Sequence, residues 1–361
     1  MPPHPSFDSY GFRYVLKVSA LLGLLLFVAD FGVGELSENI LLKPYTSTAS
    51  LDASIAEIRE GRLERELTAL AKSQEEERGI VLGFGGDIML DRGVEASIAQ
   101  NGGSFTFPFE KVAERLREYD ILFGNLEGPV SDKGSDRQNL YSFRMSPRAI
   151  GGLTFAGFDV VSVANNHTGD WGVEALRDTL ARLREADIAP VGAGEDDMEA
   201  YAPVLFTVKG VRIAFLAASQ FGKGHFVAGE DTTGIALIDE ARLHESILSA
   251  REEGADIVII SFHYGDEYTA EPNAFERRIA RKAIDLGADL VIGHHPHVLQ
   301  PIEVYKGGYI AYSLGNFIFD QGFSPETMTS GILTARVVNK KIKDVAIERL
   351  IINKDFQLEF P

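Results

Sequence analysis

Six polar residues stand at or just after the ends of short apolar runs. Their side chains supply oxygen and nitrogen donors without a thiolate, a donor set that suits Zn, Mn, Fe or Mg. In open α/β sheets, ligands bind outside the carboxyl ends of the strands. The six side chains are therefore predicted to converge on a site for one or two divalent metal ions. They are Asp87, Glu127, Asn166, His263, His295 and His297.

The sequence His295-Pro296-His297 follows an apolar run at 289–293 that reads as a buried strand. Two imidazoles two residues apart can face one cavity when the backbone between them is extended, and proline fixes φ at the middle position. The alternative is a structural or exposed histidine cluster. His263, at the end of another apolar run, favours the metal-ligand interpretation.

A second histidine motif, at 165–170, adds a candidate catalytic group. Asn166 offers its carbonyl oxygen to a metal, and the neighbouring His167 is expected to protonate a leaving oxygen as a general acid. Asp170 has two interpretations: it orients the ring of His167, or it caps the helix that starts near Trp171.

The composition excludes several classes of function. The 361 residues carry a net charge of −18, which argues against binding nucleic acid, because phosphate contacts need a basic surface. The chain has no cysteine, which rules out disulfides, thiolate metal sites and a catalytic cysteine.

The N-terminal part of the chain predicts a membrane attachment. Residues 14–33 are mainly apolar, and Arg13 and Lys17 stand near their start. With Lys17 snorkelling, the segment is long enough to act as a single-pass signal anchor, with residues 1–13 in the cytoplasm and the main domain outside it. The alternative is a cleaved signal peptide, which also places the main domain outside the cytoplasm.

Residues 34–79 are rich in Ser, Thr and charge and are expected to form a linker or stalk helix. This helix either packs on the main domain or pairs with a partner subunit. Its apolar residues recur at helical spacing. They are Leu51, Ile55, Ile58, Leu63, Leu67 and Leu70.

From residue 80 to residue 361 the pattern predicts one α/β domain. Strands are expected at 80–86, 120–124, 158–164, 211–217, 256–262 and 289–293. Helices are expected at 108–118, 172–186, 239–253 and 273–286. Two hairpins are expected near the C-terminus, one joining 299–305 to 309–314 and one joining 331–338 to 341–352.

The motifs resemble, in type and order, those of the CapA/PgsA family of poly-γ-glutamate capsule synthesis proteins. The resemblance covers about residues 80–320, and that family is similar to the calcineurin-like metallophosphoesterases. The motifs are Gly86-Asp87-Ile88-Met89-Leu90, Asn125-Leu126-Glu127-Gly128-Pro129, Asn165-Asn166-His167-Thr168-Gly169-Asp170-Trp171-Gly172, His263-Tyr264-Gly265-Asp266-Glu267-Tyr268, His295-Pro296-His297-Val298-Leu299-Gln300 and Tyr312-Ser313-Leu314-Gly315-Asn316-Phe317.

The resemblance implies a four-layer α-β-β-α sandwich with a two-metal site. Asp87 and His297 would bind the first ion, and Glu127 would bridge the two. The remaining ligands, Asn166, His263 and His295, would bind the second ion. The phosphoesterase pattern begins Asp-x-His, but Met89 stands at the third position, and a hard ion gains little from a thioether. The first position is therefore one ligand short, and Glu replaces the usual bridging Asp.

The resemblance also implies a function in poly-γ-glutamate synthesis or export, for a membrane-anchored protein with a metal-dependent hydrolase-type site. Its partners would be the membrane, synthase subunits, and an anionic polymer or a phosphoester. The alternatives are a non-catalytic scaffold subunit and an extracellular phosphoesterase unrelated to capsule. Four residues in or near the motif loops are expected to contact the substrate: Arg92, Glu267, Ser313 and Asn316.

Overall fold

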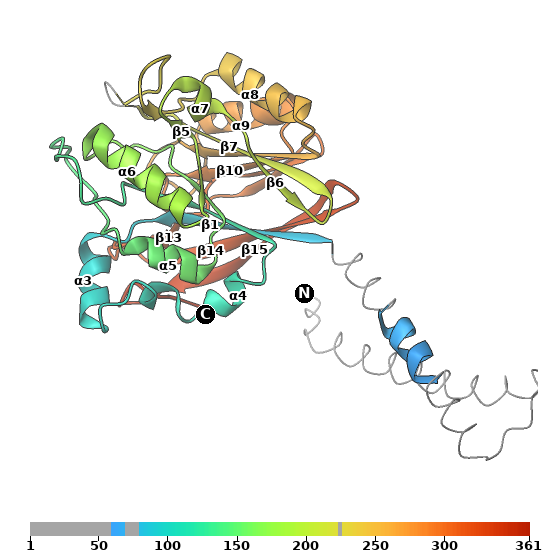
Figure 1. Ribbon diagram of the computed structural model, residues 1–361. Coiled ribbons are helices and arrows are strands. Elements are labelled where there is room, and N and C mark those ends of the chain that lie inside the picture. Colours follow the sequence, from blue (N-terminus) through green and yellow to red (C-terminus); the bar gives the residue numbers. More distant parts are fainter. Residues whose placement is uncertain (1–58, 69–78, 223–225) are drawn as a thin grey trace, which may run out of the picture. The chain divides into compact units, whose positions relative to one another are not determined.

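The computed structural model describes residues 59–68, 79–222 and 226–361 (Figure 1). The chain divides into two compact units, residues 1–72 and residues 73–361.

In the first unit, the described residues 59–68 form a helix, in agreement with the apolar spacing of Leu63 and Leu67. Among the described residues of the chain, no helix combines the length and the hydropathy needed to cross a bilayer. The predicted membrane anchor at 14–33 lies outside the described residues.

The second unit alternates strands and helices, and the α/β prediction is confirmed. Its strands are β1 (Ile80–Ile88), β2 (Ile121–Leu126), β3 (Val160–Ser162), β4 (Ala189–Val191), β5 (Ala193–Gly194), β6 (Val204–Val208), β7 (Val211–Ser219), β8 (Gly234–Ile235), β9 (Ile257–His263), β10 (Leu290–His294), β11 (Ile302–Tyr305), β12 (Gly308–Ala311), β13 (Asn316–Ile318), β14 (Thr329–Val338), β15 (Lys341–Ile352) and β16 (Leu358–Glu359). Its helices are α3 (Arg92–Gln100), the 3₁₀-helix η1 (Phe107–Phe109), α4 (Ala113–Leu116), α5 (Ala149–Ala156), α6 (Gly172–Glu185), α7 (Asp197–Tyr201), α8 (Glu240–Glu252) and α9 (Ala274–Asp285).

In the described part of the unit the strands form two large mixed sheets and a small antiparallel pair of β5 and β8. The larger sheet has the order β16-β15-β14-β1-β2-β3-β4, with β13 also pairing with β1. The smaller sheet has the order β11-β12-β10-β9-β7-β6. Strands β1 to β4 run parallel, and so do β7, β9, β10 and β12. The carboxyl ends of the parallel strands of each sheet therefore lie along one edge.

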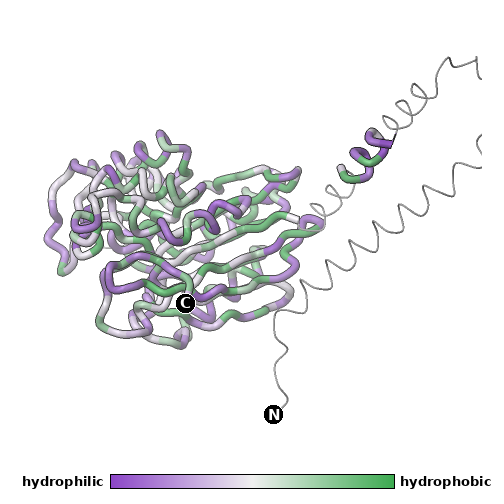
Figure 2. The backbone as a smooth tube through the Cα atoms, turned by 90° about the horizontal axis from the view of Figure 1, so that it is seen from below, coloured by the Kyte–Doolittle hydropathy of each residue, from purple (hydrophilic) through white to green (hydrophobic). Residues whose placement is uncertain are grey.

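The two sheets pack face to face around a shared hydrophobic core. Phe123 of β2 stacks on Phe215 of β7, with ring centroids 5.9 Å apart, which joins the inner faces of the sheets. Helices α8 and α9 pack on the outer face of the smaller sheet, and α4 and α5 lie on the outer side of the larger one (Figure 1). Figure 2 shows hydrophobic residues concentrated along strands and hydrophilic residues in many of the connecting loops. Parallel strands buried on both faces read as continuous apolar runs, which is why they stand out in the sequence.

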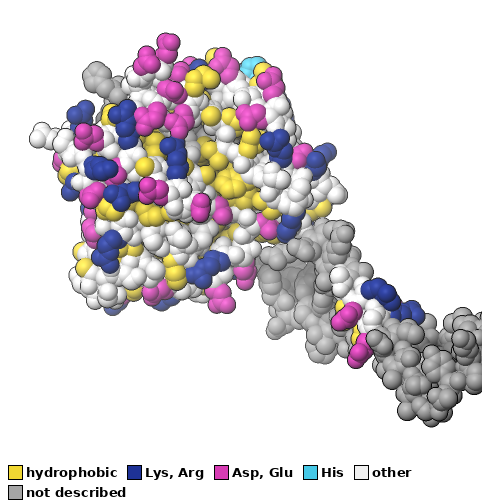
Figure 3. Space-filling view, viewed as in Figure 1, with side chains coloured by type: hydrophobic (Ala, Val, Ile, Leu, Met, Phe, Trp, Pro, Cys, Tyr) yellow, Lys and Arg dark blue, Asp and Glu magenta, His cyan; other side chains and the backbone are white. Residues whose placement is uncertain are grey.

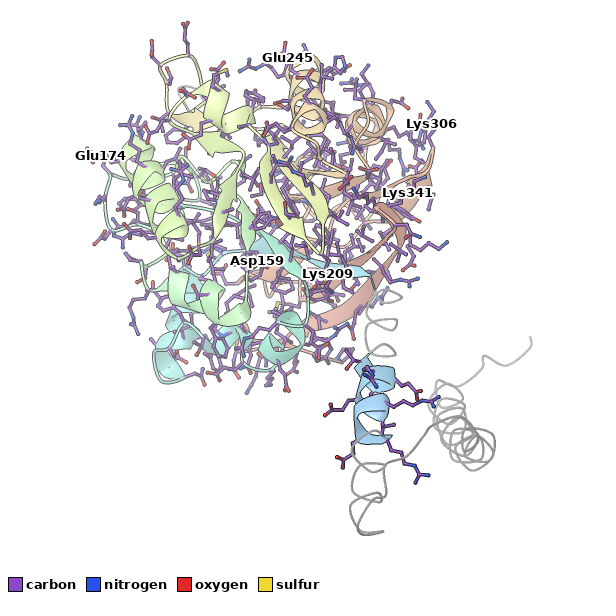
Figure 4. The ribbon with its side chains drawn as sticks, turned by 45° about the vertical axis from the view of Figure 1, so that its right-hand side comes forward. Asp159, Glu174, Lys209, Glu245, Lys306 and Lys341 are labelled. Atoms are coloured by element: carbon purple, nitrogen blue, oxygen red, sulfur yellow. The ribbon has the colours of Figure 1, made fainter. Side chains whose placement is uncertain are left out.

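Both predicted hairpins are present. In one, β14 pairs with β15 and the turn residues Asn339 and Lys340 both have positive φ, as a tight two-residue turn requires. In the other, β11 pairs with β12. The turns, marked by Lys306 and Lys341 in Figure 4, lie beside the amino ends of β10 and β1. They are thus at the opposite edge from the strand ends that carry the polar motifs.

One helix prediction is wrong in its extent. The segment 108–118 is not one helix but the turn η1 followed by the short α4. The backbone bonds from Phe109 to Thr106 and from Val112 to Phe109 span three residues, a 3₁₀ pattern, and Pro108 near the start of η1 donates none. Helices α3, α5 and α7 were not expected. The two glycines within α5 lower the helix propensity of this segment. The helix is therefore stabilised mainly by packing of its apolar face on the core.

Candidate metal centre

The predicted ligands come together at the carboxyl edge shared by the two sheets. Asp87, Glu127 and His263, from β1, the end of β2 and β9, present ligand atoms within 4.8 Å of one another. The ligand atoms of Glu267, His295 and His297 also lie within 4.8 Å of one another. The larger sheet and the smaller sheet therefore each contribute to the site.

Asp87 is fully buried and carries the densest set of contacts. Its Oδ1 accepts a hydrogen bond from Nδ2 of Asn125 at 2.8 Å, and its Oδ2 accepts one from the backbone N–H of His295 at 3.2 Å. The Nδ1 atoms of His294 and His297 lie 3.3 and 3.2 Å from its two oxygens. Burial alone would raise the pKa of Asp87, but these two imidazoles hold it well below its usual range.

A glycine makes the position of Asp87 possible. A Cβ atom on Gly86 would lie 2.0 Å from the backbone oxygen of Gly315, so the two backbones approach to a distance that a side chain forbids. The backbone N–H of Asp87 donates to that same oxygen at 2.9 Å. The segment before β13 is thereby fastened to β1 beside the site.

Glu127 follows β2 and is also fully buried. Neither carboxylate oxygen has a hydrogen-bond partner among the described residues. Its Oε1 lies 3.7 Å from Nε2 of His297 and 3.9 Å from Nε2 of His167. Burial raises the pKa of Glu127 well above its ordinary value, and the charge of Asp87 adds to this effect against the opposing attraction of His297.

The His295-Pro296-His297 segment is bent, not extended as the sequence analysis supposed. His295 has φ 96° and His297 has φ 58°, a region that non-glycine residues rarely adopt. The two rings nevertheless face one site, with centroids 5.9 Å apart. Positive φ at both residues turns the chain back, and such strain is commonly found at functional sites.

The three histidines that are predicted as ligands have different electrostatic surroundings. Burial lowers the pKa of His263 well below its usual range, and burial followed by repulsion from His297 lowers the pKa of His295 to about 3. Burial would lower the pKa of His297 too, but Glu127 and Asp87 raise it to about 9. Two of the three imidazoles thus remain neutral near neutral pH, the form that binds metal.

Asn166 is half-buried, and its Oδ1 lies 2.8 Å from Nε2 of His263. Adjacent ligand atoms of one octahedral ion at 2.0–2.1 Å are separated by about 3 Å, so this pair has the spacing of two ligands of a single ion. The same separation is that of a hydrogen bond, and the assignment of Asn166 and His263 to one ion stays a prediction.

His167 is held by an acidic partner and an aromatic ring. Its Nδ1 lies 2.7 Å from Oδ2 of Asp170, and its ring stacks on Phe143 with centroids 3.9 Å apart. Asp170 also accepts hydrogen bonds from Nδ2 of Asn139 and from the backbone N–H of Phe143. A carboxylate only accepts, so Nδ1 of His167 carries the shared proton and Nε2 is left facing Glu127.

Of the two interpretations of Asp170, the structure agrees with the orienting one. Helix α6 begins at Gly172 with Trp171 as its N-cap, and no side chain caps it. The carboxylate of Asp170 instead accepts hydrogen bonds from His167 and from the backbone N–H of Phe143.

The four predicted substrate residues have different positions. Glu267 is exposed at the mouth of the site, and Asn316 is buried against His297, with its Oδ1 3.0 Å from Nδ1 of that ring. Ser313 is buried, and its Oγ accepts from the backbone N–H of Gly315 within the same turn. Arg92 is exposed, forms an ion pair with Asp320, and lies 4.8 Å from the ring centroid of Phe143.

Met89 does not contribute a ligand. Its side chain is fully buried, and its sulfur accepts from the backbone N–H of Asp91 at 3.2 Å. Asp91 in turn caps the first turn of α3. The residue that replaces the expected histidine therefore packs in the core and supports the start of a helix.

Several residues that hold the site together were not predicted from the sequence. Asn125 joins Asp87 to Asn165, whose Nδ2 donates to it at 3.2 Å, and His294 is buried against Asp87. Asn139 and Phe143 position Asp170 and His167 from a loop without a recognisable motif. Asn125 and His294 could have been found from the sequence, since each lies at the end of an apolar strand that leads into a predicted ligand. The loop residues Asn139 and Phe143 have no comparable sequence signal.

The donor set fits a divalent metal. Glu127 has two buried oxygens without a partner, and Nδ1 of His295 is also buried without one among the described residues. Buried polar atoms ordinarily have a partner, and a buried carboxylate without one is costly. A cation among oxygen and imidazole donors would meet that need.

The chain matches the family described as "Bacterial capsule synthesis protein PGA_cap" over residues 81–321. It is 37% identical to "PGA biosynthesis protein CapA" of Bacillus subtilis over 67% of this chain and 63% of that protein, so it spans less than two thirds of that relative. It is 32% identical to "Capsule biosynthesis protein CapA" of Bacillus anthracis over 81% of this chain and 80% of that protein. A Mycobacterium tuberculosis protein named "Probable polyglutamine synthesis accessory protein" is 29% identical over 66% of this chain and 73% of its own.

Two solved structures are similar at low sequence identity. One is a hypothetical protein from Thermus thermophilus, with a TM-score of 0.47 and 18% identity over 75% of this chain and 98% of that one. The other is the calcineurin-like phosphoesterase YfkN from Bacillus subtilis, with a TM-score of 0.46 and 15% identity over 78% of this chain and 93% of that one.

Proposed function

The chain belongs to the family of bacterial capsule synthesis proteins, and from this membership we propose that it acts at the cell envelope in the synthesis or export of poly-γ-glutamate. It does so through a metal-dependent hydrolase-type site on a metallophosphoesterase-like α-β-β-α sandwich. The family match covers residues 81–321, which include every predicted site residue.

One observation carries the hydrolase part of the proposal. Both carboxylate oxygens of Glu127 are buried without a hydrogen-bond partner among the described residues, and its Oε1 lies 3.9 Å from His167 and 3.7 Å from His297. A carboxylate with only a structural role would accept hydrogen bonds from its surroundings, as Asp170 does. Glu127 is therefore the residue around which one or two divalent ions are proposed to bind.

The side chains divide the work between binding and proton transfer. A bound divalent ion supplies positive charge that polarises a phosphoryl or carbonyl oxygen of the substrate. His167, with Nδ1 held by Asp170, presents Nε2 toward the same region, and in the doubly protonated ring Nε2 would give its proton to the leaving oxygen. Stacking on Phe143 fixes the plane of the ring, so that the proton is delivered along one direction.

The membrane part of the proposal rests on the sequence. Residues 14–33 are proposed to anchor the chain, with the main domain outside the cytoplasm. An emerging polymer of γ-linked glutamate would then reach the site as a string of carboxylates. The net charge of −18 opposes such a polymer, although the face seen in Figure 3 carries acidic and basic side chains interspersed. Bound metal at the site would offset that repulsion locally.

A second candidate function is a non-catalytic accessory subunit. The relative from Mycobacterium tuberculosis bears the name of an accessory protein, which favours this alternative. In that case the fold would serve assembly, and the helix that includes residues 59–68 would bind membrane partners.

The test uses the full chain, purified and loaded with Mn²⁺ or Zn²⁺, and the variant His295→Ala. Matched measurements on His244→Ala control for loss of an exposed histidine, since His244 lies on α8 away from the site. Turnover is measured on a phosphodiester and on γ-glutamyl polymer, and polymer production is measured in cells that depend on this chain.

Loss of turnover and of polymer in His295→Ala, with His244→Ala unchanged, is the expected result. If metal-loaded protein turns over neither substrate while His295→Ala sustains polymer production, the hydrolase proposal is wrong and the accessory function stands. If the protein turns over phosphodiesters but His295→Ala leaves polymer production unchanged, the protein would instead be a phosphoesterase unrelated to capsule.

A further inference from the structure

The loop after β9 is fastened beside the His295-Pro296-His297 bend. The backbone N–H of Tyr268 donates to the backbone oxygen of Pro296 at 2.8 Å. On either side of it, Gly265 donates to Oε1 of Gln220 at 2.9 Å, and Gln300 donates to the backbone oxygen of Thr269 at 2.9 Å. Three hydrogen bonds thus fix a loop whose central residues are exposed.

The side chain of Tyr268 adds a fourth restraint. Its ring lies against that of His297, with centroids 6.0 Å apart and planes inclined by 30°. Its hydroxyl accepts from Nε2 of Gln321 at 3.2 Å, and its φ of 63° turns the loop at this point. Glu267, immediately before it, is therefore carried to the mouth of the site by a positioned backbone.

Glu267 lies within reach of the two histidines of the bend. One of its carboxylate oxygens and one ring nitrogen each of His295 and His297 are all within 4.8 Å of one another. Nδ1 of His295 is buried and has no hydrogen-bond partner among the described residues. Two imidazoles and one carboxylate form a donor set that binds Zn, Mn or Fe and leaves coordination positions open.

We propose that Glu267 is a metal ligand that shares one ion with His295 and His297, in place of the separate ions to which the resemblance assigns these two histidines, and that it adds a donor to a centre in which Met89 replaces a histidine. The inference rests on the proposed metal-dependent site and assigns Glu267 to the ion rather than to substrate alone. Met89 cannot take this role, since its thioether is buried and bound to the backbone N–H of Asp91. The donor instead comes from a loop of the smaller sheet, on the solvent side of the site.

The position of Glu267 has a consequence for how metal enters. The other carboxylates of the site, Asp87 and Glu127, are fully buried, whereas Glu267 is exposed. An exposed carboxylate keeps its hydration until the ion arrives, so it can bind an incoming cation at low desolvation cost. Glu267 would therefore bind the ion from the solvent side of the site, after the ion has entered.

The test compares metal binding by the full chain with binding by two isosteric variants, Glu267→Gln and Glu271→Gln. Glu271 is an exposed residue farther along the same loop and forms an ion pair with Arg277 at 3.0 Å, so its variant controls for the loss of one negative charge. Protein stripped with chelator is titrated with Mn²⁺ and with Zn²⁺. Calorimetry, elemental analysis and the Mn²⁺ electron paramagnetic resonance spectrum give affinity, stoichiometry and ligand environment.

Glu267→Gln is expected to bind one ion at least about tenfold more weakly and to change the Mn²⁺ spectrum, while Glu271→Gln matches the unaltered chain. Thermal unfolding of the metal-free proteins should be the same for all three, since Glu267 is exposed. Affinity and spectrum unchanged in Glu267→Gln, with metal bound by the unaltered chain, overturn the inference and leave the proposed function intact. No binding by the unaltered chain overturns both.

Discussion

Asn316 accepts a hydrogen bond from Nδ1 of His297 across 3.0 Å. Because that nitrogen is occupied, Nε2 is the one that faces Glu127, 3.7 Å away. The amide of Asn316 is itself fixed, with Nδ2 donating to the backbone oxygen of Thr327 at 2.9 Å and to Oε1 of Gln321 at 3.0 Å. Asn316 of β13 and Asp87 of β1, whose Oδ2 lies 3.2 Å from the same nitrogen, thus orient the ring of a predicted ligand that follows β10.

Replacing Asn316 with Ala should therefore weaken metal binding without removing a ligand. Outer partners of ligating histidines typically affect metal affinity or activity by about 10- to 100-fold, and a loss in that range is expected. Calorimetric titration with Mn²⁺ provides the measurement. Gln321→Ala removes a different hydrogen bond of Asn316 and one of the several restraints on Tyr268, but it leaves the oxygen of Asn316 on His297, so this control should keep most of the affinity. If both variants lose the same metal affinity, the cause would be disruption of the segment between Asn316 and Gln321 and not the loss of the hydrogen bond to His297.

Glu127→Gln should separate the metal requirement from the stability of the fold. Without metal, the amide removes a buried, partnerless carboxylate, so the variant should be at least as stable as the unaltered chain. With metal, the unaltered chain should gain about 2.7 kcal/mol at an ion concentration of 100 times Kd, and the variant far less. Thermal unfolding with and without Mn²⁺ measures both quantities. A variant that is much less stable when metal-free would show that Glu127 has a structural partner.

His167→Gln should lower turnover and leave metal bound. The ring contacts Asp170 and Phe143, and its contribution to proton transfer would be worth about 10²- to 10⁴-fold in kcat. Steady-state kinetics together with elemental analysis of the same sample provide the check. His244→Gln, an exposed histidine of α8, is the matched control. Loss of metal from His167→Gln would mean that this ring is a ligand and not the acid.

Glu276 should make stability depend on pH near neutrality. Burial raises the pKa of Glu276 from 4.5 to about 7, while its Oε2 accepts from the backbone N–H of Asn273 at the start of α9. The folded chain therefore holds a proton that the unfolded chain releases. The resulting stabilisation is complete below pH 4.5 and is lost as the pH rises through about 7.

Glu276→Gln keeps the capping contact and removes the titration. The unaltered chain should lose stability relative to this variant as the pH rises from about 5 to about 8. Urea unfolding at several pH values across that range gives the difference. Parallel curves for the two proteins would show that Glu276 does not titrate in this interval.

Asp178 should contribute stability with the opposite dependence on pH. It lies on α6 and accepts from Oγ of Ser131 and Nε of Arg182, each at 2.7 Å, and pairs with Lys133 at 2.7 Å. Burial alone would raise its pKa, but these partners lower it to about 2. The stabilisation is present above its ordinary pKa of 3.8 and is lost as the pH falls toward 2.

Asp178→Asn should therefore destabilise the chain by about 2 kcal/mol at pH 7, with a smaller difference at pH 3. Urea unfolding at the two pH values provides the comparison. The same difference at both would mean that the loss reflects hydrogen-bond geometry and not the charge of Asp178.

Much of the site could be predicted from the sequence because a polar residue that ends an apolar run marks the end of a buried strand. The apolar runs before Asp87, His263 and His295 are continuous, since buried parallel strands are covered on both faces. The hairpin at Asn339 and Lys340 was also predictable from the sequence. Only two residues separate the two strand-like segments there, and a two-residue connection between paired strands requires a tight turn. Helix extents were less predictable, as the broken segment 108–118 illustrates, because local packing outweighs propensity in short elements.

The residue types at the strand ends and their order along the chain are properties of the sequence alone, and they were enough to indicate the family. The contacts of each residue required the folded chain: Asp170 orients His167, Asn316 directs His297, and Met89 turns into the core. Folding also brought Glu267 to His295 and His297. The two kinds of information differ because strand burial is encoded locally by the apolar pattern, whereas a loop's position depends on hydrogen bonds between segments far apart in the chain.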